Sequence, residues 1–470
     1  MPGDSKSRWL RRDGWVAAAA ALLVSAAAAQ AGSSGAISAA DNQAFQGAMA
    51  AMDAGNGSAA EPVLRGLHVR HPQNYEINES LGLLYAGDGK LEQATPLLSA
   101  AAREKPDSDV ARANLGTAYL KEGKTADAAR ELAAAARLNP RNAQTQEALG
   151  QAWMMLKEPA KAAAAFEAAL GSGGSSGALL YNTALALYGS GQAAKAEPLL
   201  ARIPDVESSA EAQSLYGDVD EQLGHYEDAA KHFANAVRLD PTEANLYVFG
   251  IEFLRHWTFD PAAKEFAAGV QAFPRSQRMR LGLGVALYGA GRYNEAIPVF
   301  AGLLQENPEN NIDAELLGRT CTVLTEGEQP QCRALIDYAE KHPNDAVLAT
   351  YAATSILHQP ADAGQLAVAR KLLETAMAAN PALPEAHYGM GLLLQTQSQW
   401  AQSIPELRTA IRLRPTYASA HYRLALALSH AGQHEQANAE IALEQKYNQQ
   451  EQDSVEARLK QVTTFLVKMQ

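Results

Sequence analysis

The chain has 470 residues, which is too long for one ordinary hydrophobic core, so several domains or an array of repeats are expected. Apolar residues make up 47% of the sequence and exclude a disordered chain, while the low aromatic share of 7% favours small-residue packing between helices over a β core. The formal net charge of −12 argues against a general binder of nucleic-acid backbones, and no nucleic-acid partner is expected.

The N-terminus has the composition of an export signal. Basic residues from Lys6 to Arg12 precede an apolar run, WVAAAAALLVSAAAA, at residues 15–29. This order predicts a signal peptide over residues 1–29, and the run is shorter than the ~20 residues of a membrane span. We therefore expect an exported protein, periplasmic or secreted. The alternative is a protein anchored in the inner membrane by an uncleaved segment 15–29, which would be its sole membrane contact.

Beyond the N-terminal segment, the sequence repeats with a fixed period of 33 or 34 residues. It is carried by three independent residue types, which chance does not explain. The glycine or alanine series is Gly82, Gly116, Gly150, Ala184, Gly217, Gly250, Gly284 and Gly318; the alanine series is Ala94, Ala128, Ala162 and Ala196; the proline series includes Pro72, Pro106 and Pro140.

Each period predicts two antiparallel helices. In the segment ANLGTAYLKEG, Gly116 offers a place without a side chain where a second helix can approach, and Gly123 ends the first helix. The segment TADAARELAAAARL then places Ala128, Leu132 and Ala135 on one face, and Pro140 ends the second helix. One pair cannot bury both apolar faces, so stacking into a solenoid is expected.

The period and its residues resemble the tetratricopeptide repeat (TPR) family. The pattern of Leu-Gly, Tyr, Ala, a bulky apolar residue, Ala and Pro is clearest in the repeats that begin at Tyr75, Asp109, Gln277 and Pro384. The resemblance implies an all-α fold, an α-solenoid in which about twelve helix pairs form a right-handed superhelix. Repeats from Asn311 and Ala346 depart from the pattern, with a longer turn TEGEQPQC and extra residues at HQPADAGQ.

The repeats divide into groups at one glycine-rich joint. Residues 41–176 hold repeats 1–4 and residues 177–449 hold repeats 5–12, with GSGGSSGA between them in place of the usual proline. Gly and Ser impose no fixed geometry, so residues 171–177 are either a hinge or a slack loop between stacked helices. Residues 450–470 carry an apolar stripe and are expected to form a C-terminal capping helix, or else a helix for a partner or a membrane surface.

Two cysteines lie eleven residues apart, at Cys321 and Cys332. An oxidising compartment would permit a disulfide between them. The alternative is two unpaired thiols packed as small apolar residues.

No catalytic constellation is present in the sequence. Gly284 lies in LGLG, but it occupies the repeat's own small-residue place rather than a nucleotide-binding loop. The pairs His68/His71 and His430/His434 have helical spacing but no obvious third metal ligand. We therefore expect no enzymatic activity, no cofactor and no metal site.

The expected binding surface is the concave groove that, in the family the sequence resembles, is lined by the first helices and holds peptides. The phase of the repeats predicts that nine aromatic or aliphatic side chains project there: Tyr181, Leu185, Tyr188, Tyr247, Ile251, Leu254, Leu281, Val285 and Tyr288. Such groups on a rigid surface are suitable peptide anchors. The alternative is that they fill the space between neighbouring repeats.

Three arginines from successive repeats share this predicted surface: Arg255, Arg278 and Arg319. Guanidinium groups bind carboxylates in a two-pronged geometry, so an acidic or C-terminal peptide is a candidate ligand; the alternative is three separately solvated arginines.

The sequence as a whole favours a scaffold or adaptor that binds a protein or peptide partner of unknown identity, in the cell envelope. The alternatives are a scaffold or regulatory subunit of an envelope enzyme system for polysaccharide synthesis or glycosyl transfer, and a lipid-binding protein.

Overall fold

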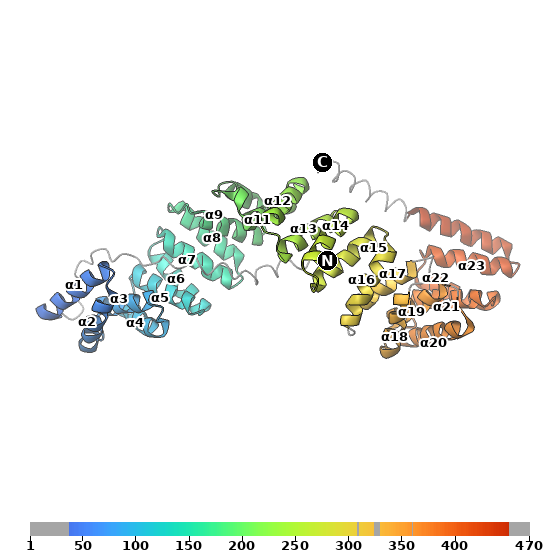
Figure 1. The fold of residues 1–470 in the computed structure, drawn as a ribbon, viewed down its shortest axis with the longest axis horizontal. Coiled ribbons are helices and arrows are strands. Elements are labelled where there is room, and N and C mark those ends of the chain that lie inside the picture. The colour runs from blue at the N-terminus through green and yellow to red at the C-terminus, as the bar shows by residue number, and fades with distance from the viewer. Residues whose placement is uncertain (1–36, 308–309, 324–329, 360, 451–470) are drawn as a thin grey trace. The chain divides into compact units, whose positions relative to one another are not determined.

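The computed structural model describes residues 37–307, 310–323, 330–359 and 361–450 (Figure 1). Within these ranges the regular elements are helices, and no strand occurs. The predicted signal peptide and the predicted capping helix beyond residue 450 lie outside the described residues. None of the helices that the structure describes combines the length and the hydropathy that a membrane crossing needs.

The chain separates into two compact units, an N-terminal unit that ends at His225 and a C-terminal unit that begins at Tyr226. The helices of the N-terminal unit are α1 (Ala39–Asp53), α2 (Gly57–Arg70), α3 (Tyr75–Gly87), α4 (Leu91–Glu104), α5 (Asp109–Lys121), α6 (Thr125–Leu138), α7 (Ala143–Met155), α8 (Pro159–Gly171), α9 (Gly177–Gly189), α10 (Ala193–Leu200) and α11 (Ala210–Leu223), with a 3-10 turn η3 (Val206–Ser208).

The helices of the C-terminal unit are α12 (Tyr226–Leu239), α13 (Glu243–Arg255), α14 (Phe259–Ala272), α15 (Gln277–Gly289), α16 (Tyr293–Glu306), α17 (Asn311–Val323), α18 (Arg333–Lys341), α19 (Ala346–Leu357), α20 (Ala363–Ala379), α21 (Pro384–Thr396), α22 (Trp400–Leu413) and α23 (Ala418–His430), with a 3-10 turn η4 (Pro330–Cys332). Residues 434–450 are helical as well. Within each unit, successive helices pair and stack as an α-solenoid, which confirms the predicted fold class.

The periodic glycine lets the two helices of a repeat approach closely. A Cβ atom on Gly116 would lie 2.6 Å from Leu132 Cγ, and one on Gly284 would lie 2.5 Å from Phe300 Cε1. Both contacts are closer than packed atoms tolerate, so glycine is required on steric grounds. Counting from the first residue of each repeat, the glycine holds place 8 and the bulky residue that covers it holds place 24.

Wherever the structure describes place 15 of a repeat, the chain turns there through a left-handed residue. Gly123 has φ +75°, as predicted. Lys157, Trp257 and Ser398 take the same place with φ of 61°, 58° and 60°. A residue with a Cβ atom pays a conformational cost in this region, so the stacked neighbours impose the turn even where glycine is missing.

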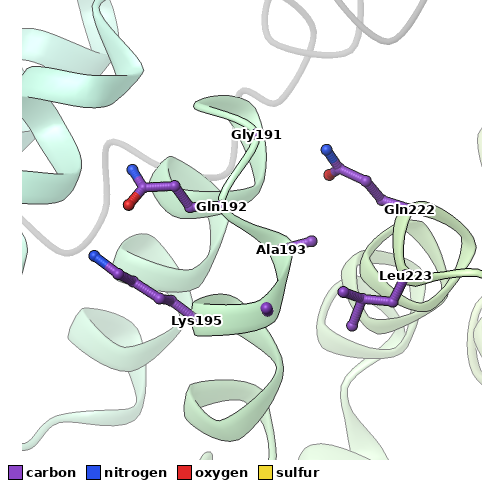
Figure 2. Close-up of a pocket in the computed structure, with 7 residues that line it drawn as sticks. Gly191, Gln192, Ala193, Lys195, Gln222 and Leu223 are labelled. Atoms are coloured by element: carbon purple, nitrogen blue, oxygen red, sulfur yellow. The ribbon is translucent and has the colours of Figure 1, made fainter.

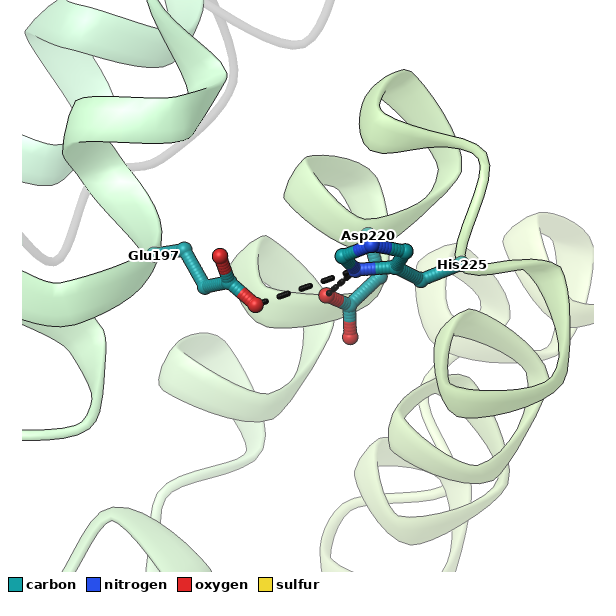
Figure 3. Close-up of side chains that lie close together, drawn as sticks. All are labelled: Glu197, Asp220 and His225. Carbon is teal, nitrogen blue, oxygen red and sulfur yellow. Dashed lines mark ion pairs between the residues drawn. The ribbon is translucent and has the colours of Figure 1, made fainter.

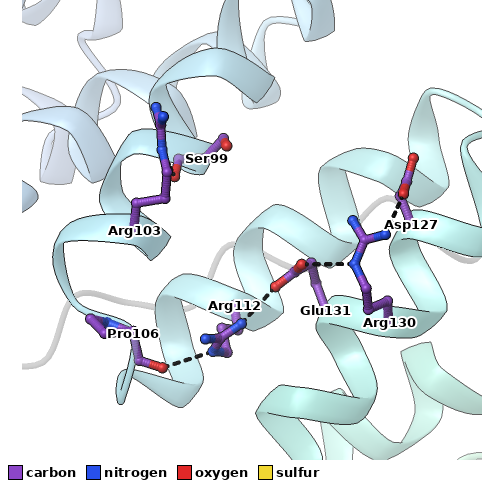
Figure 4. Close-up of polar contacts among 7 residues, drawn as sticks. All are labelled: Ser99, Arg103, Pro106, Arg112, Asp127, Arg130 and Glu131. Atoms are coloured by element: carbon purple, nitrogen blue, oxygen red, sulfur yellow. Dashed lines mark hydrogen bonds and ion pairs between the residues drawn. The ribbon is translucent and has the colours of Figure 1, made fainter.

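A polar clasp ties some first helices to the preceding repeat. Arg112 Nε donates to the carbonyl oxygen of Pro106 at 2.8 Å, and its Nη1 donates to Glu131 at 2.9 Å (Figure 4). His387 repeats the arrangement with the Pro381 carbonyl at 3.0 Å and Glu406 at 2.7 Å. Both residues hold place 4, so the proline that ends a repeat also supplies an acceptor to the next one.

The structure describes two features that the sequence left open, the glycine-rich loop at residues 171–177 and the cysteine pair. Helices α8 and α9 contribute Phe166, Ala169, Leu179 and Ala184 to one hydrophobic core, so both pack on the same core across the glycine-rich loop. In the irregular repeat of α17 and α18, Cys321 and Cys332 are bonded as a disulfide with their Cα atoms 6.0 Å apart. Both half-cystines are buried, at 1% and 5% exposure.

Candidate peptide-binding surface

In the N-terminal unit, the predicted groove residues lie on α9. The Ser176 side chain accepts a hydrogen bond from the Leu179 backbone and starts this helix. Tyr181 is buried in the core, at 8% exposure, whereas Leu185 and Tyr188 are half-buried against it. Tyr181 therefore contributes mainly to packing, and Leu185 and Tyr188 keep part of their surface accessible.

In the C-terminal unit, the predicted groove residues lie on α13 and α15. Six side chains are half-buried and pack against the core of this unit: Tyr247, Ile251, Leu254, Leu281, Val285 and Tyr288. A half-buried side chain is held in place by its neighbours and still presents an apolar face. Packing and binding, the two readings of these residues, are therefore compatible at this surface.

The three predicted arginines are exposed, and each has an acidic partner. Arg278 Nε donates to Glu243 at 2.6 Å, and its guanidinium carbon lies 5.1 Å from the centre of the Tyr247 ring. Arg319 Nη2 donates to Glu315 at 2.6 Å. Arg255 lies 3.5 Å from a carboxylate oxygen of Glu252.

These pairs change what the arginines can do chemically. Their side chains remain 46%, 42% and 52% exposed for Arg255, Arg278 and Arg319. Glu243 and Glu315 are themselves 35% and 43% exposed, and exposed ion pairs are worth about 0–1 kcal/mol, so a ligand carboxylate could replace either of them at small cost. Glu252 is fully buried, so the same exchange is not expected at Arg255. Arg280, which the sequence places near this group, instead forms two hydrogen bonds to Glu306 at the end of α16.

Sequence reasoning missed a continuation of this surface toward the C-terminus. The rings of Tyr388 and Tyr417 lie 5.0 Å apart, and the Arg414 guanidinium carbon lies 4.6 Å from the centre of the Tyr417 ring. Arg414 also pairs with Glu385. We call Tyr247, Tyr288, Tyr351, Tyr388 and Tyr417, with Arg278, Arg319 and Arg414, the tyrosine–arginine row.

Burial shifts the pKa of three tyrosines of the row. It raises the pKa of Tyr288 and of Tyr351, and the positive charge of Arg319 opposes the rise at both rings. Burial also raises the pKa of Tyr417. The phenols therefore stay protonated at neutral pH and can donate hydrogen bonds.

The histidine pairs point to separate partners. His68 Nδ1 lies 2.6 Å from Asn78 Oδ1, and His71 Nε2 lies 2.9 Å from Asp41 Oδ2. His430 stacks on Trp400 with ring centres 3.8 Å apart. His68 and His71 therefore contact different side chains.

Depressions of different size lie in the described part of the N-terminal unit. A small one lies between α5 and α7 and is lined by Val110, Ala113, Asn114, Thr117, Asn142, Gln144, Thr145 and Ala148. A wider, open one lies between the start of α10 and the end of α11 and is lined by Gly191, Gln192, Ala193, Ala194, Lys195, Gln222 and Leu223 (Figure 2). The first follows the first helices of two successive repeats and so belongs to the predicted groove.

The comparisons with known proteins agree with this architecture. A family model described as tetratricopeptide repeat matches residues 45–109, 114–178, 181–244, 247–311 and 388–450. No curated protein matches the chain.

Among solved structures, the chain is similar to Naa15/Naa10 bound to HypK-THB, with 17% identity, a TM-score of 0.39, and 86% of this chain and 68% of that chain covered. It is similar to YrrB, a TPR protein with an unusual peptide-binding site, with 20% identity, a TM-score of 0.35 and coverage of 39% and 95%. It is also similar to PilF of Pseudomonas aeruginosa, with 19% identity, a TM-score of 0.36 and coverage of 44% and 94%.

Proposed function

Because the chain belongs to the tetratricopeptide repeat family, we propose that it is a non-catalytic scaffold that binds a protein partner on the concave surface of its first helices. Repeats of this family typically serve as protein-interaction scaffolds. The observation that carries the proposal for this chain is the tyrosine–arginine row of the C-terminal unit, which combines half-buried aromatic rings with exposed guanidinium groups.

The chemistry of the row fits an acidic segment or a free C-terminus of the partner. An arginine guanidinium group donates two parallel hydrogen bonds to a carboxylate, and the protonated tyrosines add further donors. The apolar faces of Ile251, Leu281 and Val285 would take up the partner's hydrophobic side chains. Exchange of Glu243 or Glu315 for a ligand carboxylate keeps each arginine paired, so binding leaves no buried charge unmatched.

The proposed place of action is the cell envelope. This part of the proposal rests on the basic start and apolar run of residues 1–29, which have the composition of an export signal. An exported scaffold would meet its partner in the periplasm or outside the cell.

The test begins with an affinity pull-down from an envelope extract at moderate salt, followed by mass spectrometry of what stays bound. The dominant partner is then titrated against the wild type and against Arg278→Glu. We expect charge reversal at Arg278 to weaken the affinity at least about tenfold, because it replaces an attraction by a repulsion within the row.

A matched control is available in the same repeat. Arg292 lies in the turn before α16 and pairs with Glu295 at 2.7 Å. Arg292→Glu makes the same charge change off the row, so its affinity should stay within about twofold. Equal affinities for the wild type and both variants, at unchanged helicity, would remove the row as the binding surface; copurified lipid without protein would contradict the scaffold itself.

A further inference from the structure

Three ionisable side chains of the N-terminal unit lie close together outside the proposed groove. Glu197 lies on α10, Asp220 lies on the last turns of α11, and His225 follows that helix after Gly224 (Figure 3). The three side chains point toward one another, and their donor atoms lie within 4.8 Å of one another.

The distances in this cluster are longer than those of four other histidine–carboxylate contacts, one of which joins His256 Nε2 to Glu252 Oε1 at 3.3 Å. His225 Nδ1 lies 3.7 Å from Glu197 Oε1 and 3.6 Å from Asp220 Oδ1. By contrast, His71, His387 and His421 approach their carboxylates to 2.9, 2.7 and 2.6 Å. The His225 ring thus lies between two carboxylates, beyond normal hydrogen-bond distance of either.

Distances of this size are typical of ligands that share a metal ion. Zn–N bonds of about 2.0–2.1 Å and Zn–O bonds of about 2.0–2.2 Å place two ligand atoms of a tetrahedral ion about 3.4 Å apart. The Glu197 side chain is 40% exposed, so rotation about its own bonds can bring its oxygen closer to the other two ligands.

The repeat supplies an internal comparison. At the corresponding places of the first two repeats stand Glu61, Tyr85 and Lys90. There the Lys90 ammonium lies 3.3 Å from Glu61, and the Tyr85 hydroxyl donates to the same carboxylate at 3.3 Å. The contact between the first and second repeats, which we call the first joint, therefore contains its own cation, the Lys90 ammonium group.

The later joint replaces that cation with a possible ligand. His225 stands where the earlier joint has Lys90, and Asp220 stands where it has Tyr85. The ligand form of histidine is neutral, so two carboxylates and one imidazole carry a charge of −2. A divalent cation neutralises this charge in the way that Lys90 neutralises Glu61.

Asp220 is also the exception at its own place in the repeat. Its side chain is 4% exposed, and burial of a carboxylate is costly. Place 11 is hydrophobic in the eleven other repeats, where it holds Ala51, Tyr85, Tyr119, Trp153, Leu187, Phe253, Leu287, Cys321, Ile356, Leu394 and Leu428. A charged residue at a packing place fits a role other than packing.

We propose that Glu197, Asp220 and His225 bind a divalent transition-metal ion of the Zn²⁺ class. Imidazole and carboxylate are suitable ligands for this class, and three protein ligands leave a coordination position for water. The ion ties α10 to α11, two helices that also flank the open depression of Figure 2. This site departs from the sequence-based expectation of no metal, because the ligands come from two repeats.

The experiment titrates the chelator-treated full chain with Zn²⁺ in competition with a chromophoric indicator and compares it with two variants. Asp220→Leu restores the hydrophobic residue that other repeats have at place 11. His225→Lys places an ammonium group where the first joint has Lys90. His434→Ala removes an exposed histidine elsewhere and serves as the control.

We expect the wild type and His434→Ala to bind one Zn²⁺ more tightly than the two site variants do. Loss of an outer-shell partner alone costs 10–100-fold in affinity, so loss of a ligand should weaken this site by more than about 100-fold. Saturating Zn²⁺ should raise the melting temperature of the wild type and leave that of the site variants unchanged.

Two results would overturn the proposal: no Zn²⁺ bound by the wild type at micromolar concentration, or unchanged affinity and stoichiometry in either site variant. The exposed position of His225 keeps the test valid even if Asp220→Leu disturbs the fold, because His225→Lys changes a side chain that is half in solvent.

Discussion

The concave faces of the two units differ in chemistry although one repeat rule builds both. Between α5 and α7 of the N-terminal unit the groove carries small side chains such as Ala113, Asn114 and Thr117. The C-terminal unit carries tyrosines and arginines there, with Arg278 against Tyr247 and Arg414 against Tyr417. Place 8 holds glycine or alanine in both units, whereas the groove places differ between them. Under the proposed function, we therefore expect ligand choice to depend on the groove places.

The interior residue at place 24 differs in size within both units. It is Leu64, Leu98, Leu132 or Phe166 in the N-terminal unit and Phe233, Phe266, Phe300 or Leu407 in the C-terminal unit, and all of these side chains are fully buried. A larger side chain at the same place fills more of the space between helices, which widens the contact without changing the period.

The largest effect we expect is from emptying place 24. Phe266→Ala should destabilise the protein by about 3–5 kcal/mol and Leu132→Ala by about 2–5 kcal/mol, because each removes buried surface and leaves a cavity. Denaturant unfolding measures the totals, and hydrogen exchange of the backbone amides localises them.

Because repeats of a solenoid contact only their neighbours, protection should fall first around the substituted repeat. Suppose instead that either substitution reduced the protection of backbone amides from exchange equally in both units. The two units would then unfold together, and their stabilities could not be compared separately.

Smaller opposite effects are expected from two glycines of neighbouring helices. Gly284→Ala places a Cβ atom 2.5 Å from the Phe300 ring and should cost about 1–3 kcal/mol. Gly302→Ala, on α16, meets nothing within 4 Å and should stabilise the helix by about 0.5–1 kcal/mol. Melting temperatures of the two variants report the difference; a gain in both would mean that place 8 has room to spare.

The fold can be predicted from the sequence because the residues that recur in each repeat are required on steric grounds. Gly116 and Gly123 have one physical reason each, a close helix contact and a left-handed turn, and both reasons are legible in a single repeat. The proposed binding surface is harder to predict from the sequence. Periodicity points Arg278 to the groove, but its partner Glu243 lies 35 residues away on the preceding repeat.

Two further features can be recognised only when the packing of neighbouring repeats is known. Tyr417 joins the tyrosine–arginine row from the turn before α23, so a rule based on first helices misses it. Asp220 interrupts a hydrophobic series that is visible in the sequence, yet its companions Glu197 and His225 become apparent only once α10 and α11 are packed.

The smallest expected effect separates the units by their response to acid. In the N-terminal unit, hydrogen bonds from His71 and then Arg70 lower the pKa of Asp41 from 3.8 to about 2. Its contribution to stability is therefore present above pH 3.8 and is lost as the pH falls to about 2. In the C-terminal unit, burial raises the pKa of Asp313, against the opposing effects of Asn310 and Arg280.

The effect of Asp313 on the free energy of unfolding therefore has the opposite sign. The folded protein becomes more stable relative to the unfolded chain as the pH falls through the raised pKa of Asp313 toward 3.8. Melting temperatures of the wild type, Asp41→Asn and Asp313→Asn between pH 7 and pH 2 measure both effects. The advantage of the wild type over Asp41→Asn should shrink on acidification, whereas any deficit against Asp313→Asn should close. Parallel curves for the two variants would mean that the carboxylates share one environment, and the electrostatic contrast between the units would be withdrawn.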